Sequence, residues 1–336
     1  MAQKKLKIGI NGFGRIGRQA FRLGFDQFDI VGVNGLMSGE EITHLLKYDS
    51  LHKTWDKKIE MGEGSFSVDG KKVMWSEKKD PKDIPWKDWG ANVVLECTGA
   101  FKTKQDFEKH IHAGAKRVLV SAPANGADFT VVYGVNHTEY NPKTHFIVSN
   151  ASCTTNCLAP IVKVLNDDFG IEKGLMTTVH SYTNDQRILD GNHSDLRRAR
   201  AAALSMIPTT TGAAKTVGKI IPEMEGRIDG FSIRVPTPNV SLVDFTFESQ
   251  KKVSVESIND SLIKASQNSM KGILDVEHQP LVSTDFNGNP ASSTIDLLST
   301  MVIGGNMVKV ISWYDNEIGF SMRMLDMLDY MADKGL

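Results

Sequence analysis

The chain has 336 residues, of which 40% are hydrophobic and 24% are charged, and its formal net charge is −1 at pH 7. This length suits two domains, and the balanced charge provides no basic field that would favour nucleic acid or an anionic membrane. The sequence has no apolar run of membrane-spanning length, and glycine and arginine interrupt its basic start too early for a secretory signal. Three cysteines are too few for a disulfide scaffold, so we expect a cytoplasmic protein in a reducing compartment.

The first part of the chain alternates predicted strands with helices. A glycine turn at residues 11–18 follows the first apolar run and opens a segment with helical spacing, and residues 104–115 fit a helix that ends at glycine. This alternation is typical of a parallel sheet, so we expect a Rossmann-type doubly wound domain over residues 1–150. Strands are predicted at residues 5–10, 28–34, 91–99, 115–123 and 130–136.

The second part has longer strand-like runs with polar alternation, at residues 174–183, 226–249 and 305–317. Such runs, with helical segments between them, predict an α+β domain with a mostly antiparallel sheet over residues 151–316. The amphipathic segment 317–334 predicts a terminal helix.

Three glycines, Gly12, Gly14 and Gly17, form the pattern G-x-G-x-x-G between a predicted strand and a predicted helix. Glycine lets the backbone turn tightly and approach a pyrophosphate, and the helix N-terminus offers free N–H groups. A tight turn with close helix–strand packing is the alternative, and the strand–turn–helix context favours dinucleotide binding.

The acidic residue expected at the end of the second strand is missing. Asn34, Gly35 and Leu36 occupy that position, and Glu40 and Glu41 come later, in the first turn of the next predicted helix. A carboxylate there would bind the ribose hydroxyls of NAD and repel the 2′-phosphate of NADP. NADP is therefore compatible with this strand end, and NAD loses a favourable contact.

The cysteines of the stretch SNASCTTNCLAP are Cys153 and Cys157. Their spacing is poor for a metal site without a second ligand pair, and the Cβ directions at i and i+4 of a helix close a disulfide badly. The remaining interpretation makes Cys153 a nucleophile at a helix N-terminus, where the dipole and free N–H groups lower a thiol pKa. Cys157 would then be an inert buried thiol, and Cys97 part of an apolar core strand.

A nucleophilic thiol needs a base, and His180, at the end of a strand-like run, suits that role. Spacing alone does not select it over His110, His112 or His193. The polar segment 180–202 is rich in arginine, which is typical either of a solvated loop with ion pairs or of a phosphate site. Residues 208–215 and Arg234 add hydroxyls, possible loop N–H donors and another guanidinium.

Several stretches together resemble the phosphorylating glyceraldehyde-3-phosphate dehydrogenases, and the resemblance runs nearly end to end. These stretches are INGFGRIGR, LLKYDS, SNASCTTNCLAP, TTVHSYTNDQ, DLRRARAA, IPTTTGAAK, RVPTPNVS and SWYDNEIGFS. The resemblance implies a Rossmann domain plus a catalytic domain, with the terminal helix packing back on the first, and a cytoplasmic homotetramer without a metal.

The resemblance also implies the chemistry and the roles of individual residues. Cys153 forms a thiohemiacetal and then a thioester, His180 takes the hydroxyl proton, a hydride passes to NAD or NADP, and inorganic phosphate releases 1,3-bisphosphoglycerate. Other residues are implied to contact the cofactor: Gly12, Gly14, Arg15, Ile16, Gly17, Gly35, Lys79, Ser121 and Asn316. The implied anion sites comprise Ser152, Thr154, Thr183, Arg198, Thr211, Gly212 and Arg234.

Two departures from the family pattern concern the cofactor. Gly35 stands where the family commonly has Asp, and Gly191-Asn192 where NAD-specific bacterial members often have Leu-Pro. Both favour the hypothesis that the enzyme uses NADP, either alone or alongside NAD. Against it, no new arginine lies beside Gly35 in the sequence, where Ser38 is the one obvious hydroxyl.

Two alternatives remain. Erythrose-4-phosphate dehydrogenase resembles this family but uses water as the acceptor, and the intact HSYTNDQ and TTTGAAK stretches favour the phosphorylating enzyme. A catalytically silent binding or redox-sensing relative would be indicated by loss of Cys153 or His180, and both are present.

Overall fold

The computed structural model describes residues 5–336 and divides the chain into two compact units. Unit 1 comprises the chain up to Val131, His137–Ala151 and Ser321–Leu336, and unit 2 comprises Val132–Asn136 and Ser152–Phe320. Residues 1–4, with which the predicted first domain begins, lie outside the described residues.

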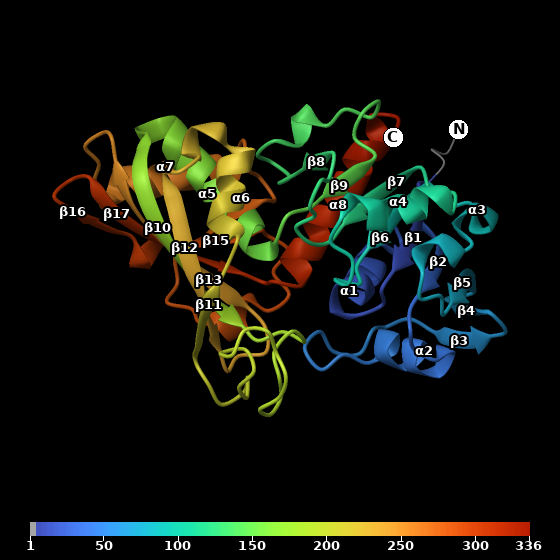
Figure 1. The fold of residues 1–336 in the computed structure, drawn as a ribbon. Helices are drawn as coiled ribbons and strands as arrows, with labels where there is room; N and C mark the ends of the chain where they lie inside the picture. The colour runs from blue at the N-terminus through green and yellow to red at the C-terminus, as the bar shows by residue number, and fades with distance from the viewer. Residues whose placement is uncertain (1–4) are drawn as a thin grey trace. The chain divides into compact units, whose positions relative to one another are not determined.

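Unit 1 is built on a nine-stranded sheet in the order β3-β4-β5-β2-β1-β6-β7-β9-β8 (Figure 1). All pairs from β5 to β8 are parallel, and only the β3-β4 and β4-β5 pairs are antiparallel. The predicted doubly wound parallel sheet is therefore confirmed. Its strands are β1 (Lys7–Asn11), β2 (Asp29–Asn34), β3 (Ile59–Gly62), β4 (Ser65–Val68), β5 (Lys71–Ser76), β6 (Val93–Glu96), β7 (Arg117–Val120), β8 (Phe129–Thr130) and β9 (Ile147–Ser149).

The helices of unit 1 carry recognisable end signals. Ser38 caps α2 by accepting from the Glu41 N–H at 3.2 Å, and the Glu41 carboxylate accepts from the Ser38 N–H at 2.7 Å, which is a capping box. The last helix packs within this unit, because a Cβ on Gly24 would lie 3.1 Å from Leu325. The helices are α1 (Arg15–Gly24), α2 (Gly39–Lys47), α3 (Trp86–Trp89), α4 (Lys104–His112) and, from Ser321 onward, α8 (Ile318–Asp333).

The strand predicted at residues 130–136 is wrong beyond its first residue. Only Phe129–Thr130 pair, as β8, and the chain then turns. Gly134 has φ +88°, and the Asn136 side chain accepts from the Val132 N–H at 2.9 Å, so a local side-chain hydrogen bond replaces a strand ladder.

Unit 2 contains an eight-stranded sheet in the order β11-β12-β10-β13-β17-β15-β14, with β16 paired to β17. The β10-β12 and β14-β15 pairs are parallel and the other pairs are antiparallel, as the sequence predicts for the larger part of this sheet. The strands are β10 (Ile171–Ser181), β11 (Ile207–Thr210), β12 (Ile228–Val235), β13 (Ser241–Ser249), β14 (Leu274–Glu277), β15 (Ser293–Asp296), β16 (Met301–Ile303) and β17 (Met307–Tyr314).

Three helices cover this sheet, namely α5 (Cys153–Phe169), α6 (Ala213–Ile220) and α7 (Val255–Gln267). The central helix α5 contacts β10, β13, β15 and β17 as well as both other helices. Most residues of α5 are buried, and this tertiary packing retains the helix although it contains Pro160.

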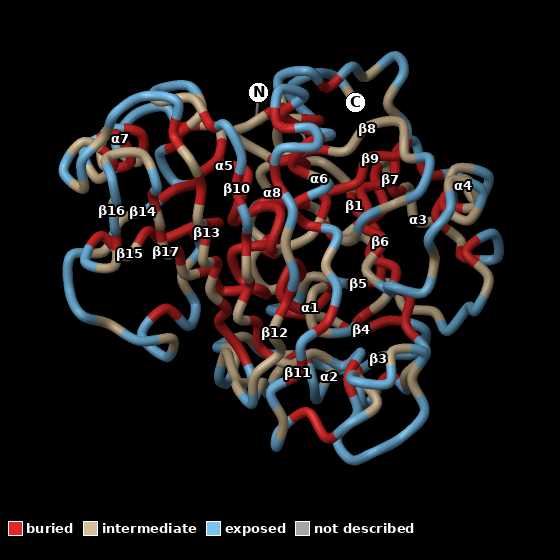
Figure 2. The backbone as a smooth tube through the Cα atoms, turned by 60° about the vertical axis from the view of Figure 1, so that its left-hand side comes forward, coloured by how far each residue is buried: buried red, intermediate tan, exposed pale blue. Residues whose placement is uncertain are grey.

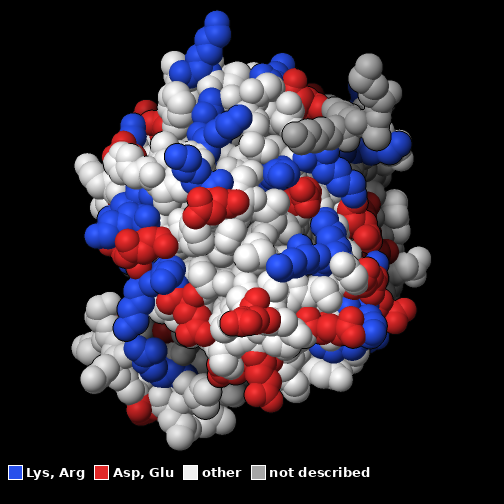
Figure 3. Space-filling view, turned by 90° about the vertical axis from the view of Figure 1, so that its right-hand side faces the viewer, with Lys and Arg blue, Asp and Glu red and all other residues white. Residues whose placement is uncertain are grey.

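The core of each unit lies along its sheet, where buried residues concentrate on the strands and exposed residues on the connections (Figure 2). On the face drawn in Figure 3, acidic and basic side chains are interspersed across the described residues. Within residues 5–336, no helix has the length and hydropathy required to cross a membrane.

Candidate active site

Cys153 is the first residue of α5, as the spacing of its neighbours predicts. Ser152 is the N-cap residue, and its hydroxyl accepts from the Thr155 N–H at 3.1 Å. Before it, Ala151 has φ +54°, a left-handed conformation that costs free energy in a non-glycine residue. This bend turns the chain from the end of β9 into α5 and so places Cys153 at the first position of the helix.

The thiol and the imidazole of His180 are brought together in unit 2. The Sγ of Cys153 lies 3.5 Å from Nε2 of His180, which is on β10 and is buried. The Nδ1 of the same ring lies 2.7 Å from the carbonyl oxygen of Ser181, to which it donates in the tautomer that is protonated at Nδ1. In that tautomer the lone pair of Nε2 faces the thiol.

Strand register places a guanidinium beside this pair. His180 and Arg234 are direct partners in the parallel pairing of β10 with β12. The Nη1 of Arg234 lies 3.0 Å from the Ser181 carbonyl oxygen and 2.9 Å from Nδ1 of His180. Arg234 therefore contributes a positive charge to the edge of the thiol–imidazole pair.

Burial and charge favour the neutral form of both groups of this pair. Burial, with the charges of Arg234 and Arg198, lowers the pKa of His180 to about 3. Burial also raises the pKa of the Cys153 thiol, while Arg234 and the Thr154 N–H at the start of the helix lower it. The lowered thiol pKa predicted from the helix N-terminus is thus outweighed by burial, and the reactive form requires proton transfer within the pair.

Tyr314 on β17 also packs against the thiol–imidazole pair, although no sequence pattern selects it as a site residue. Its hydroxyl bonds to Thr154 Oγ1 and Thr178 Oγ1, both at 2.9 Å, and its ring meets that of His180 edge-on at 5.9 Å. Its position at the end of an alternating strand was the only available signal.

Cys157 lies one turn further along α5 and is fully buried. Its Sγ lies 3.6 Å from the hydroxyl of Ser293, and burial raises its pKa to about 12. It is therefore a poor nucleophile at neutral pH.

Arg198 is the arginine of the polar segment whose charge reaches the thiol–imidazole pair. Its guanidinium donates to Thr209 Oγ1 at 2.9 Å, to Asp185 at 2.8 Å and to the Thr210 carbonyl oxygen at 3.1 Å. By contrast, Arg187 and Arg200 make hydrogen bonds inside the segment, to the Asn192 carbonyl and to Asp190. Arg187 and Arg200 therefore stabilise the segment itself, whereas Arg198 also acts electrostatically on the thiol–imidazole pair.

The remaining anion-site candidates lie at a helix start and in the polar segment. Gly212 is the N-cap of α6 and leaves that helix without a side-chain cap, and Thr211 accepts from the Ala213 N–H at 3.2 Å. The Thr183 N–H lies 3.3 Å from the side-chain oxygen of Gln186. Among the described contacts, Thr154 is connected to the thiol–imidazole pair through its hydrogen bond to Tyr314. The hydrogen bonds of Thr183, Thr211 and Gly212 involve residues within four positions along the chain.

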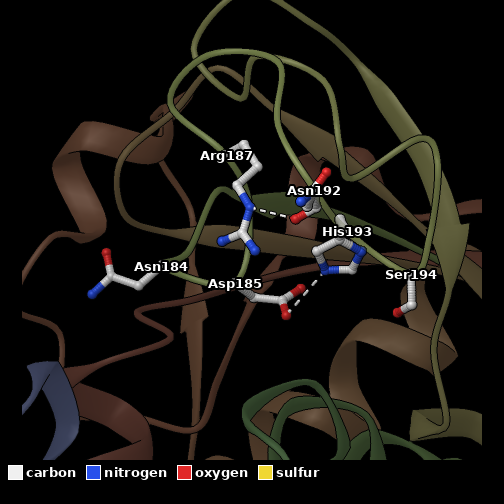
Figure 4. A pocket seen from close by; sticks show the side chains of 6 residues that line it. All are labelled: Asn184, Asp185, Arg187, Asn192, His193 and Ser194. Atoms are coloured by element: carbon white, nitrogen blue, oxygen red, sulfur yellow. Dashed lines mark hydrogen bonds and ion pairs between the residues drawn. The ribbon is translucent and has the colours of Figure 1, made fainter.

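The polar segment also forms an open pocket of about 730 Å³ (Figure 4). His193 lies 3.4 Å from Asp185 across it, and Asn192, from the Gly191-Asn192 departure, is part of its lining. The lining residues are Asn184, Asp185, Arg187, Asn192, His193 and Ser194.

The glycine turn of unit 1 has the geometry of a nucleotide cradle. Gly12 has φ +90°, and a Cβ on Gly17 would lie 2.1 Å from the Gly12 carbonyl oxygen, so both positions require glycine. Gly14 is the N-cap of α1, has no side-chain cap, and has open space where a Cβ would be. The first N–H groups of α1, including that of Ile16, therefore have room for an anion.

A pocket of about 370 Å³ adjoins this turn. Gly35, Lys78 and Lys79 lie in its lining with Gly12 and Gly14, and the lining contains no carboxylate among the residues that the structure describes. The Ser38 hydroxyl is the cap of α2 and is not part of the lining.

Two further cofactor candidates in unit 1 have structural partners. The guanidinium of Arg15 forms a two-bond ion pair with Asp49, at 2.6 Å and 3.1 Å, and this pair holds the pKa of the Asp49 carboxyl well below its usual range. Ser121 donates its N–H to the Glu96 carbonyl oxygen at 3.0 Å and its side chain lies against Cys97.

Cys97 is not the core residue that the sequence predicts. It follows the end of β6, is half-buried, and lines the pocket beside the glycine turn. Burial and the neighbouring Glu96 raise the pKa of its thiol. β6 ends at Glu96, three residues before the end of the predicted strand 91–99, so Cys97 lies outside the strand and beside the pocket.

Asn316 follows β17 in unit 2, with its side chain held in one orientation. Its Oδ1 accepts from the hydroxyls of Ser181 and Ser241, both at 2.9 Å.

Among residues 5–336, no group of three or more His, Cys, Asp or Glu side chains could hold a metal ion.

Comparisons with known proteins agree with this geometry. Residues 6–104 match the model of the glyceraldehyde 3-phosphate dehydrogenase NAD binding domain, and residues 152–316 match that of its C-terminal domain. The chain belongs to the glyceraldehyde-3-phosphate dehydrogenase family. It is 54% identical over 333 residues to a glyceraldehyde-3-phosphate dehydrogenase of Geobacillus stearothermophilus, covering 98% of this chain and 99% of that one. It is 51% identical over 334 residues to a protein of the same name from Xanthobacter flavus, with the same coverage.

For this family member, the structure separates His180 from the other histidines considered. His110 is buried between Trp86 and Glu96, His193 faces Asp185, and His112 is exposed at the end of α4. Only His180 is in contact with Cys153 among these four side chains.

Proposed function

We propose that this family member catalyses the phosphorylating oxidation of D-glyceraldehyde 3-phosphate to 1,3-bisphosphoglycerate, with NAD or NADP as the hydride acceptor. The observation that carries the proposal is the 3.5 Å contact between Cys153 Sγ and Nε2 of His180. A thiol that can pass its proton to an adjacent base is what covalent oxidation of an aldehyde requires.

Residues 1–150 are proposed to bind the dinucleotide, and residues 151–316 to carry the chemistry, with the terminal helix 317–334 belonging to the first part. The uncapped N-terminus of α1 and the space at Gly14 fit a pyrophosphate bound through the Arg15 and Ile16 N–H groups. Gly35 and Lys79 would line the adenosine part, and Ser121 and Asn316 the nicotinamide part. When bound, the nicotinamide ring supplies the acceptor for the hydride.

In the first half of the reaction, Cys153 Sγ attacks the aldehyde carbon, and the S–C bond forms as the carbonyl electron pair moves to oxygen. The thiol proton passes through His180 Nε2 to that oxygen, which gives a thiohemiacetal. His180 Nε2 then takes the hydroxyl proton as the C–H bond gives up its hydride, and a thioester remains on Cys153. The Ser181 carbonyl, which accepts from Nδ1, stabilises the imidazolium that results.

In the second half, an oxygen of inorganic phosphate attacks the thioester carbon, the C–S bond breaks, and Cys153 leaves as a thiolate. His180 returns its proton to that sulfur. Arg234 neutralises negative charge next to the pair, and anion binding there would offset the charge effect that lowers the His180 pKa. The anion-binding residues are proposed to be Ser152, Thr154, Thr183, Arg198, Thr211, Gly212 and Arg234.

The choice of cofactor is proposed to include NADP. The pocket beside Gly35 is lined by Lys78 and Lys79 and by no carboxylate among its described residues. Such a surface accepts a 2′-phosphate without like-charge repulsion.

The chain is also proposed to form a homotetramer, as the family resemblance implies. Unit 2 exposes large apolar side chains on its sheet, and a second exposed set lies in the connection between β10 and β11. Two separate apolar surfaces are therefore available for contact with other subunits. Sedimentation velocity on the purified protein tests this, and a monomer at micromolar concentration would contradict it. The sheet residues are Leu175, Phe231, Met301, Ile303 and Met307, and the loop residues are Ile188, Leu189, Leu196, Leu204 and Met206.

The initial rate of reduced dinucleotide formation tests the reaction. Glyceraldehyde 3-phosphate and phosphate are kept saturating, NAD and NADP are varied in parallel, and phosphate is omitted in a control. Activity that requires phosphate supports the proposal, and equal activity without phosphate indicates water as the acceptor. No activity with either dinucleotide would refute the proposed function.

A further inference from the structure

A chain of buried polar side chains runs through unit 1 behind the dinucleotide pocket. The indole N–H of Trp86 donates to Nδ1 of His110 at 2.9 Å, and Nε2 of His110 lies 3.0 Å from the Glu96 carboxylate. All three side chains are buried, with His110 and Trp86 at 0% exposure and Glu96 at 2%. The three residues come from α3, α4 and the last position of β6.

The direction of each hydrogen bond in this chain is determined by chemistry. An indole nitrogen can only donate, so Nδ1 of His110 accepts and Nε2 carries the proton that is donated to Glu96. The second donor to the same carboxylate oxygen is the amide of Asn11, at 2.6 Å. The other carboxylate oxygen accepts from the Thr98 N–H at 2.8 Å and from the Thr98 hydroxyl.

Glu96 thus holds two segments of the pocket wall while not lining the pocket itself. Asn11 and Thr98 both line the pocket. Asn11 accepts from the Asn34 amide at 2.7 Å, and Asn34 accepts from the Lys78 N–H at 2.8 Å, so the chain continues to the lysines opposite Gly35.

The glycine turn also packs against Thr98, one of the two residues to which Glu96 is hydrogen-bonded. A Cβ on Gly12 would lie 2.5 Å from the Thr98 backbone nitrogen, so these two backbones are in direct contact. A shift of Thr98 therefore displaces the turn from which α1 begins. Packed backbone of this kind transmits small displacements because it has little free volume.

We propose that Glu96, oriented by His110 and Trp86, is a positioning residue for dinucleotide binding. Its carboxylate fixes the Thr98 backbone and the Asn11 amide, and through them the glycine turn. The proposal rests on the proposed function, since it assumes that this pocket binds the dinucleotide. The alternative is a hydrogen-bonded core cluster that affects stability alone.

The test uses the full-length Glu96→Gln variant. Glutamine keeps the shape of the side chain but replaces one acceptor oxygen with a donor, which must then face Thr98 or face His110 and Asn11. We expect the Kd for the dinucleotide, measured by titration calorimetry, to rise about tenfold. The KM for the dinucleotide should rise with it, while kcat at saturation and the KM for phosphate stay within about twofold.

Asp128→Asn is the matched control. Asp128 also accepts backbone N–H groups in unit 1, from Phe146 and Ile147 at 2.9 Å, but it does not line the pocket. This control should lower the melting temperature without changing the Kd. If Glu96→Gln lowers only the melting temperature and leaves the Kd unchanged, the positioning role is refuted.

A double-mutant cycle with Thr98→Val tests the route. If Glu96 acts through Thr98, the double variant loses less affinity than the sum of the two single losses, and additive losses contradict this route. His110→Gln offers a milder perturbation if Glu96→Gln does not fold, and a Kd equal to that of the wild type would again refute the role. Failure of the wild-type protein to bind NAD or NADP would instead refute the proposed function.

Discussion

Replacing Gly35 with aspartate should shift cofactor preference strongly toward NAD. A Cβ at this position would lie 3.3 Å from the Cβ of Phe13 and 3.9 Å from Cδ1 of Ile42. The backbone is not in the left-handed region, so the side chain fits after a shift of a few tenths of an ångström. The new carboxylate would enter the lining that now contains only Lys78 and Lys79 as charged groups among the described residues.

The size of the shift follows from two effects. A carboxylate that accepts a ribose hydroxyl contributes about 1.5–3 kcal/mol to NAD binding. The same carboxylate about 4 Å from a 2′-phosphate repels it by about 1 kcal/mol in water and about 4 kcal/mol at the effective dielectric of a protein surface. The lysines reduce the repulsion, so we expect a combined change of about 3 kcal/mol, or about a hundredfold in the ratio of kcat/KM values.

The assay is the ratio of kcat/KM for NAD to that for NADP, measured for the wild type, Gly35→Asp and Gly35→Asn. Asparagine has nearly the same shape without the charge, so it separates the steric effect from the electrostatic one. If aspartate and asparagine change the ratio equally, or if aspartate weakens both cofactors alike, Gly35 is not the position that discriminates the 2′-phosphate.

Three other predictions concern single side chains. His180→Asn should lower kcat by about 10²–10⁴-fold because the base is lost, while iodoacetamide still labels Cys153; unchanged kcat in steady-state kinetics would exclude His180 as the base. Asp49→Asn should lower the free energy of unfolding by about 1–3 kcal/mol because the ion pair with Arg15 is lost. The folded pKa of Asp49 is depressed below its ordinary value of 3.8, so its contribution to stability is complete above that value and is lost as the pH falls through the folded pKa. Urea unfolding should therefore show the two proteins converging in acid, and a constant difference would contradict the ion pair. Cys157→Ala should cost about 1 kcal/mol of stability and leave kcat unchanged, whereas a large loss of activity with normal stability would assign this thiol a direct role.

Local features of the active site could be predicted because local rules decide them. The stretch before Cys153 contains a capping serine, so the helix begins at the cysteine, and Gly170 ends it. The glycines of the first turn are required by a positive φ at Gly12 and a 2.1 Å approach at Gly17, and both effects depend on neighbours a few residues away. The same reasoning failed at residues 131–136, where the apolar pattern of a strand competes with a turn that Gly134 and the Asn136 side chain stabilise.

The sequence by itself therefore determined the alternating strands and helices, the glycine cradle and the position of the nucleophile at a helix start. Only the tertiary structure placed Arg234 beside His180, through the register of β10 with β12, and the ring of Tyr314 on β17 against that of His180. It also decided the protonation of the thiol pair, because burial outweighs the helix N-terminus. The physical reason is range: caps, turns and periodicity act over a few residues, whereas strand order and burial join residues that lie far apart in the chain.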